Sequence, residues 1–139
     1  KYMKQQKRRG PAPPAAAVQN TDRAAKYRNT PTERVTASGA VLRFDSQKEA
    51  RRYDHLTLRQ QAGEIHDLRL QVDFTLQEAY TDPEGRRVRA IRYRADFTYR
   101  ERDGRLVVED VKSKPTRTRE YLIKRKLMKE RRGIDITEV

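Results

Sequence analysis

Three charged residues in the second half of the chain, Asp96, Asp110 and Lys112, have the types and spacing needed to act on a phosphate ester. Asp110 and Lys112 are two positions apart, so on a β-strand both side chains point to one face. Two carboxylates that face each other repel, and a divalent cation between them removes that cost. Oxygen ligands suit Mg²⁺ or Mn²⁺, which hold a phosphate and activate water, while a nearby lysine orients that water. The triplet therefore predicts metal-dependent phosphodiester hydrolysis.

The elements around the triplet, rather than the triplet alone, favour a catalytic role. An Asp-x-Lys sequence alone is common and usually forms a salt bridge along a strand. Here it follows a turn and a strand that contains Asp96, and a basic segment comes after it. Glu109 competes for the acidic role, but Lys112 shares a face with Asp110 and not with Glu109. Asp110 is therefore preferred, and Glu109 is expected on the helix-covered face, paired with an arginine.

The apolar pattern predicts the elements before the triplet. A helix is expected over residues 46–62, where Ser46 and Glu49 form a capping box. Residues 68–76 alternate between apolar and polar, which is typical of a half-buried strand.

The register expected between the second and third strands does not place Asp96 opposite Asp110. Four apolar residues share one face of the second strand: Tyr93, Ala95, Phe97 and Tyr99. Asp96 lies on the opposite face. Asp103-Gly104 is a hairpin signal. A two-residue turn there would place Asp110 opposite a position near Phe97. A bulge or splay is therefore expected to bring Asp96 and Asp110 together.

The remaining elements complete the predicted fold. A third strand is expected over residues 105–112, a second helix over 116–132 that Gly133 ends, and a final strand over 134–139. A strand–helix–strand ending implies a parallel pair. The expected fold is α/β, an α-β-β-β-α-β order with a mixed sheet flanked by helices.

Positive charge is concentrated in two segments. The net charge is +13, with +7 in residues 1–38 and +6 in residues 115–132. Residues 1–38 contain a Pro/Ala-rich stretch and few large apolar residues, which predicts a flexible basic arm before a domain over 39–139. Concentrated charge favours a nucleic-acid partner over a role in solubility alone. The expected phosphate contacts are Lys114, Arg117, Arg119, Lys124, Arg125, Arg28, Arg8 and Arg9.

The composition also excludes several classes of protein. The chain has no Cys, which rules out disulfides and thiolate zinc sites and fits a cytoplasmic protein. No segment approaches the roughly 18 apolar residues of a membrane span. No glycine-rich phosphate loop is present.

Five stretches carry a resemblance to a known superfamily: YRNT (27–30), FDSQKEA (44–50), AGEI (62–65), YRADF (93–97) and VEDVK (108–112). With the order of elements, they resemble the PD-(D/E)XK nucleases and, more narrowly, a small uncharacterised family of phage and prophage proteins. The resemblance covers about residues 27–139, and Ala95 stands where many members have Pro before the aspartate.

The resemblance implies a restriction-endonuclease-like core and a Mg²⁺- or Mn²⁺-dependent DNA endonuclease of a bacterial host, with Asp96 and Asp110 as metal ligands. It makes Glu49 a fourth candidate, although a helix cap explains Glu49 equally well. It also offers Gln71 as a site-lining residue, although an exposed glutamine on a strand is the favoured interpretation. Among its activities, resolution of branched DNA such as Holliday junctions during phage recombination is favoured, and this requires a homodimer.

Two alternatives stay open. The chain could be a non-catalytic nucleic-acid-binding protein, of a ribosome-associated or packaging type, or a member of the nuclease fold without turnover. The geometry of the carboxylates separates them: aspartates within reach of one cation favour the enzyme, and aspartates on opposite faces favour the binding protein.

Overall fold

The computed structural model describes residues 32–139, which contain two α-helices, one four-stranded β-sheet and two two-stranded β-sheets. The chain divides into two compact units, Lys1–Ala50 and Arg51–Val139. Most of the predicted arm, including Arg8, Arg9 and Arg28, lies outside the described residues. Within residues 32–139, no helix combines the length and the apolar character that a membrane crossing requires.

The described part of the first unit is a short hairpin followed by the start of a helix. Strand β1 (Glu33–Val35) pairs antiparallel with β2 (Val41–Arg43), a hairpin that the sequence pattern did not predict. Helix α3 (Gln47–Gln61) begins after Ser46, whose Oγ accepts a hydrogen bond from the backbone N–H of Glu49 at 3.1 Å. The predicted helix and its N-cap are therefore confirmed.

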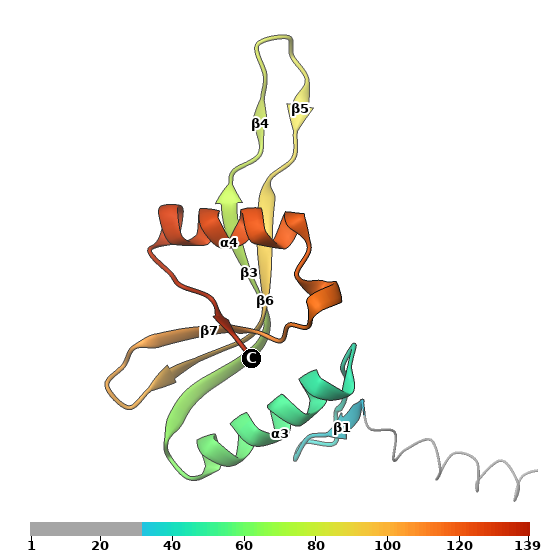
Figure 1. Cartoon of the computed structure of the whole chain (residues 1–139), viewed down its shortest axis with the longest axis vertical. Coiled ribbons are helices and arrows are strands. Elements are labelled where there is room, and N and C mark those ends of the chain that lie inside the picture. The colour runs from blue at the N-terminus through green and yellow to red at the C-terminus, as the bar shows by residue number, and fades with distance from the viewer. Residues whose placement is uncertain (1–31) are drawn as a thin grey trace, which may run out of the picture. The chain divides into compact units, whose positions relative to one another are not determined.

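The second unit contains a four-stranded sheet in the order β3 (Ile65–Gln77), β6 (Ile91–Glu101), β7 (Leu106–Asp110) and β8 (Thr137–Glu138). The first two pairings are antiparallel, and β7 pairs with β8 in parallel. The mixed sheet, the two helices and the parallel pair agree with the sequence prediction. Beyond β3 and β6, the short strands β4 (Tyr80–Thr81) and β5 (Arg87–Val88) extend the ribbon past α4 (Arg119–Arg132), as Figure 1 shows.

Helix α4 covers one face of this sheet. It begins later than predicted, because a 3-10 turn, η1 (Lys114–Thr116), precedes it and Thr118 caps it by accepting the N–H of Tyr121 at 3.1 Å. Gly133 ends it in the left-handed conformation, as predicted. The core beneath it contains Leu76, Tyr93, Ala95, Val108, Tyr121 and Met128.

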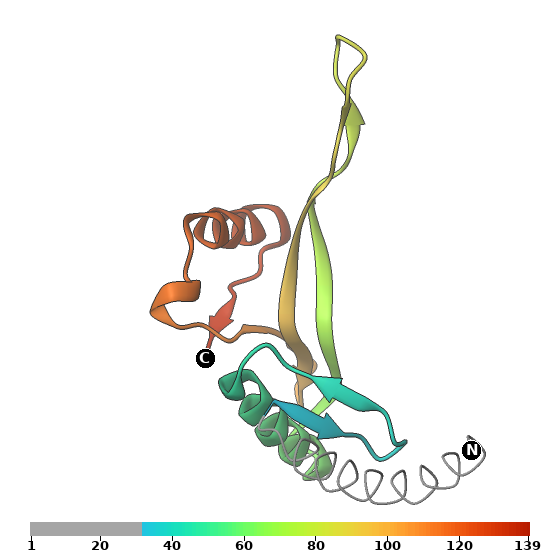
Figure 2. The ribbon, with the colours of Figure 1, turned by 90° about the vertical axis from the view of Figure 1, so that its right-hand side faces the viewer.

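The ribbon of β3 and β6 changes faces at Asp96. Tyr93 lies in the core with Val108, whereas Tyr99 donates a hydrogen bond to Glu109. Val108 and Glu109 are consecutive residues of β7, so their side chains point to opposite faces of the sheet. The prediction that Tyr93 and Tyr99 share a face was therefore wrong. The reversal coincides with Gln71, which lies across from Asp96 and has a φ of +54°. Figure 2 shows the curvature of the ribbon.

Candidate functional site

Asp96 and Asp110 face each other across the β6–β7 hairpin. The pairs Arg100–Leu106, Tyr99–Val107, Thr98–Val108 and Phe97–Glu109 are in register, and the next step brings Asp96 opposite Asp110. The sequence predicted a two-residue turn and a compensating bulge, and that prediction was wrong.

The hairpin loop itself supplies the alignment. The N–H of Glu101 donates a hydrogen bond to the carbonyl oxygen of Arg105 at 3.0 Å, and the N–H of Gly104 donates to the carbonyl oxygen of Glu101 at 2.9 Å. The loop between the paired residues therefore contains the three residues 102–104. Gly104 has a φ of +89°, the left-handed conformation that such a three-residue loop needs at its last position. One additional loop residue shifts the register by one and aligns the aspartates without a bulge.

The two carboxylates share a poorly solvated space. Burial, with the charge of Asp110 and a hydrogen bond between the two side chains, raises the pKa of Asp96 to about 6. The backbone N–H of Val111 donates to Asp96 Oδ2 at 2.8 Å and, with the charge of Lys112, acts in the opposite direction. The pair therefore tends to hold a proton between its oxygens below about pH 6.

Asp110 is buried and held from two sides. Tyr93 Oη donates to Asp110 Oδ2 at 2.6 Å, and Lys112 Nζ lies 3.0 Å from Asp110 Oδ1. The pKa of the Tyr93 phenol is raised by burial and by this hydrogen bond, so the phenol remains a donor. Tyr93 is a contact that the sequence did not predict, because the alternation placed it on the face opposite Asp96.

Lys112 packs against an aromatic ring. Its Nζ lies 4.1 Å from the centre of the Tyr121 ring, and its side chain is only 15% exposed. Tyr121 Oη in turn donates to Glu138 Oε2 at 2.7 Å, and burial with this bond raises the pKa of the Tyr121 phenol. The ring and the Asp110 carboxylate together fix the position of the Lys112 ammonium group.

Glu138 forms ion pairs with two arginines that the sequence analysis proposed as phosphate contacts. Arg125 Nη1 lies 2.7 Å from its Oε2 and Arg117 Nε lies 3.1 Å from its Oε1. The Tyr121 hydrogen bond, followed by those of the two arginines, lowers the pKa of Glu138. Arg117 and Arg125 thus tie the final strand to the α4 region, while Lys114 is exposed on η1.

Glu109 has a structural role on the other face of the strand. It is 1% exposed and forms a bidentate ion pair with Arg52 of α3, at 2.8 Å from Nε and 2.6 Å from Nη2. Tyr99 Oη also donates to it. The expectation that Glu109 is paired with an arginine, and that Asp110 rather than Glu109 lies beside Lys112, is confirmed.

The other proposed site residues have different surroundings. Glu49 is buried in the first turn of α3, within the first unit, and its role as a metal ligand stays a prediction. Gln71 is exposed, across the β3–β6 pairing from Asp96. Across residues 32–139, no three His, Cys, Asp or Glu side chains form a group able to hold a metal ion.

The aspartate pair fits a divalent cation that draws its remaining ligands from outside the protein. A cation between the two carboxylates would offset their burial and mutual repulsion, which raise the pKa of Asp96, and would take the place of a shared proton. Mg²⁺ is commonly held by one or two carboxylates together with water and substrate phosphate. The donor set Asp96 and Asp110 is therefore sufficient for such an ion, although it makes no closed protein cage.

A cleft of about 250 Å³ opens beside Asp110 and Lys112, with Tyr93, Tyr121 and Lys124 in its lining. Lys124 pairs with Glu120 at 3.2 Å at its edge. The cleft gives an external ligand access to the side of the site that carries the lysine.

Comparisons with known proteins identify a family. A family model described as "Protein of unknown function (DUF1064)" matches residues 24–137. Neither curated proteins nor solved structures give a match to the chain. Because the family model spans most of the sequence, the chain belongs to the DUF1064 family.

Proposed function

We propose that the protein is a divalent-metal-dependent DNA endonuclease of the PD-(D/E)XK type. The observation that carries this proposal is the juxtaposition of Asp96 and Asp110 across β6 and β7, with the Lys112 ammonium group 3.0 Å from Asp110. Two carboxylates on adjoining strands, with a lysine two residues after the second, are the groups that metal-dependent phosphodiester hydrolysis requires.

Each residue has a distinct task in this proposal. Asp96 and Asp110 hold Mg²⁺ or Mn²⁺, which when bound supplies an electrophile for the phosphate and acidifies water. Lys112 orients the attacking water and balances the charge that develops on the phosphoryl oxygens. Tyr93 keeps Asp110 in place through its 2.6 Å hydrogen bond.

The order of elements supports a restriction-endonuclease-like core. Apart from the short strands β4 and β5 and the 3-10 turn η1, the elements from α3 onward are α3, β3, β6, β7, α4 and β8, an α-β-β-β-α-β order. The concentration of Lys and Arg in residues 115–132 supports DNA as the partner. We infer a phage or prophage enzyme that acts in the cytoplasm of a bacterial host.

Branched DNA is the substrate that we propose within this class. Resolution of a four-way junction needs two symmetric cuts and hence a homodimer. The test is incubation of the full chain with supercoiled, linear and four-way-junction DNA, in Mg²⁺, Mn²⁺ or chelator. The proposal expects cleavage with metal only and a dimer on the junction. A protein that stays monomeric on the junction would exclude the resolvase subtype.

A non-catalytic nucleic-acid-binding protein is the second candidate. One observation favours it: Lys112 and Tyr93 already satisfy both oxygens of Asp110. Among the described residues, no buried side-chain nitrogen or oxygen lacks a hydrogen-bond partner. Such a self-contained network can serve stability alone. Binding of DNA without cleavage in either metal would favour this second function or an inactive nuclease fold.

A further inference from the structure

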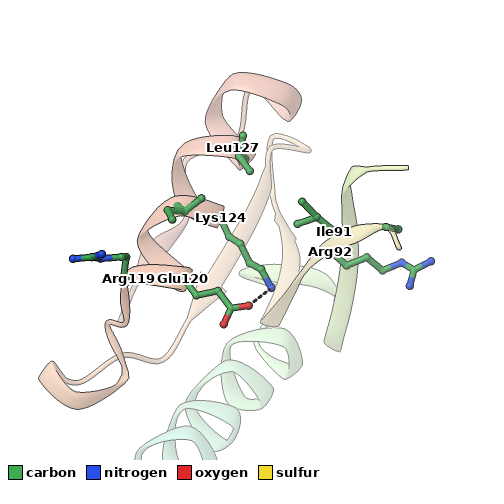
Figure 3. Close-up of a pocket in the computed structure, with 8 residues that line it drawn as sticks. Ile91, Arg92, Arg119, Glu120, Lys124 and Leu127 are labelled. Carbon is green, nitrogen blue, oxygen red and sulfur yellow. Dashed lines mark ion pairs between the residues drawn. The ribbon is translucent and has the colours of Figure 1, made fainter. Parts of the chain in front are cut away.

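A second, larger cavity adjoins the carboxylate cleft. It has a volume of about 530 Å³ and lies between the first residues of β6 and helix α4, as Figure 3 shows. Glu120 and Lys124 line both cavities, so the two meet along the first turns of α4. A ligand in the larger cavity would therefore extend toward Asp110.

The floor of this cavity, here called the α4 groove, is apolar. Ala90 and Ile91 contribute from the strand side, and Ile123 and Leu127 contribute from the helix. Ile91 is 38% exposed and Ile123 is 52% exposed. Exposed apolar side chains grouped in a concave surface are typical of a ligand site.

The rim of the α4 groove is cationic. Arg92 and Arg119 lie at its two sides with side chains that point outward, and Lys124 lies between them (Figure 3). Glu120 is the acidic residue of the lining. It forms an ion pair with Lys124, and its own side chain is 77% exposed. Three cations against one carboxylate leave a positive rim. An apolar floor with cations on two sides complements a flat, weakly polar group flanked by anions.

We propose that the α4 groove receives one unpaired nucleotide of the DNA substrate, with its base on Ile91 and Ile123 and its flanking phosphates at Arg92 and Arg119. This inference rests on the proposed function and specifies its substrate. A base inside a duplex must be unstacked at a cost of a few kcal/mol before it can enter such a groove. DNA with an unpaired nucleotide, as in gaps, flaps and branch points, is therefore preferred over perfect duplex.

The test measures binding by the full chain in chelator, where no cleavage occurs. The probes are a duplex with one unpaired 2-aminopurine and the same duplex fully paired. We expect the unpaired probe to bind about fivefold more tightly, with a change in 2-aminopurine fluorescence. Ile123→Ser should remove most of this preference. Leu58→Ser is the matched control, because Leu58 is a 63% exposed apolar residue of α3.

Three results would overturn the inference. Equal affinity for the two probes, or a preference that Ile123→Ser leaves intact, would exclude a base in the groove. A change in the oligomeric state of the free protein on Ile123→Ser would instead make the groove an interface between copies. The outcome is separable from that of the proposed function. Cleavage without the preference removes only the groove, and the preference without cleavage in Mg²⁺ or Mn²⁺ removes only the nuclease.

Discussion

Asp96 and Asp110 stand opposite each other because the β6–β7 loop contains three residues rather than two. The additional residue lets Gly104 close the loop in the left-handed conformation, and the register that follows pairs the aspartates directly. Burial and the mutual repulsion of the pair then raise the pKa of Asp96 to about 6.

The stability of the protein should depend on pH through Asp96. Its folded pKa of about 6 exceeds the ordinary value of 3.8, so the folded state binds the proton more tightly. The stabilising contribution is therefore present below about pH 4 and is lost as the pH rises through about 6. The stability of wild type relative to Asp96→Asn should fall over this interval in urea unfolding. Mg²⁺ should suppress the fall, and a difference that does not change with pH would contradict the assignment.

The Glu109–Arg52 pair should stabilise the fold and contribute nothing directly to a reaction. Glu109→Gln leaves the Arg52 charge partly buried without its counter-charge, which costs about 3 kcal/mol of unfolding free energy. Asp73→Asn is the control, because Asp73 forms an ion pair with Arg94 in which the two side chains are 44% and 61% exposed. That change should barely alter the urea midpoint. Equal effects of the two substitutions would refute the structural role of Glu109.

Tyr121 should position Lys112 through its ring rather than through its hydroxyl. Tyr121→Phe keeps the ring beneath Lys112 and loses only the bond to Glu138, so cleavage should stay near the wild-type rate. Tyr121→Leu removes the ring and should lower the rate about fivefold to tenfold and shift the pH profile. Rates are compared below the unfolding temperature of each variant. Equal losses in both variants would point to the Glu138 contact instead.

Much of the fold follows from local patterns. The capping box at Ser46 and the apolar period predict a helix over 46–62, and α3 spans Gln47–Gln61. The placement of Lys112 on the face of Asp110, and of Glu109 with an arginine, follows from strand alternation alone. These features depend on neighbours two to four positions apart, which the sequence displays directly.

The remaining features depend on pairing between strands. Asp103-Gly104 is compatible with loops of two or three residues, and only the Glu101–Arg105 bond distinguishes them. The reversal of faces at Asp96 occurs beside Gln71, a non-glycine residue with a positive φ that composition does not signal. Tyr93 joined the site because of this reversal. Its proximity to Asp110 was therefore not predictable from alternation.

The most direct measurement is DNA cleavage by wild type, Asp110→Asn and Asp135→Asn. Asp135 is a matched control, because it is also an aspartate and is distant from Asp110 in the sequence. Its side chain is 80% exposed and forms an ion pair with Lys129. Wild type and Asp135→Asn should cut DNA in Mg²⁺ or Mn²⁺ and not in chelator. Asp110→Asn should lose cleavage while its DNA affinity is retained. Cleavage by Asp110→Asn at the wild-type rate would contradict the assignment of the Asp96–Asp110 pair as the metal site.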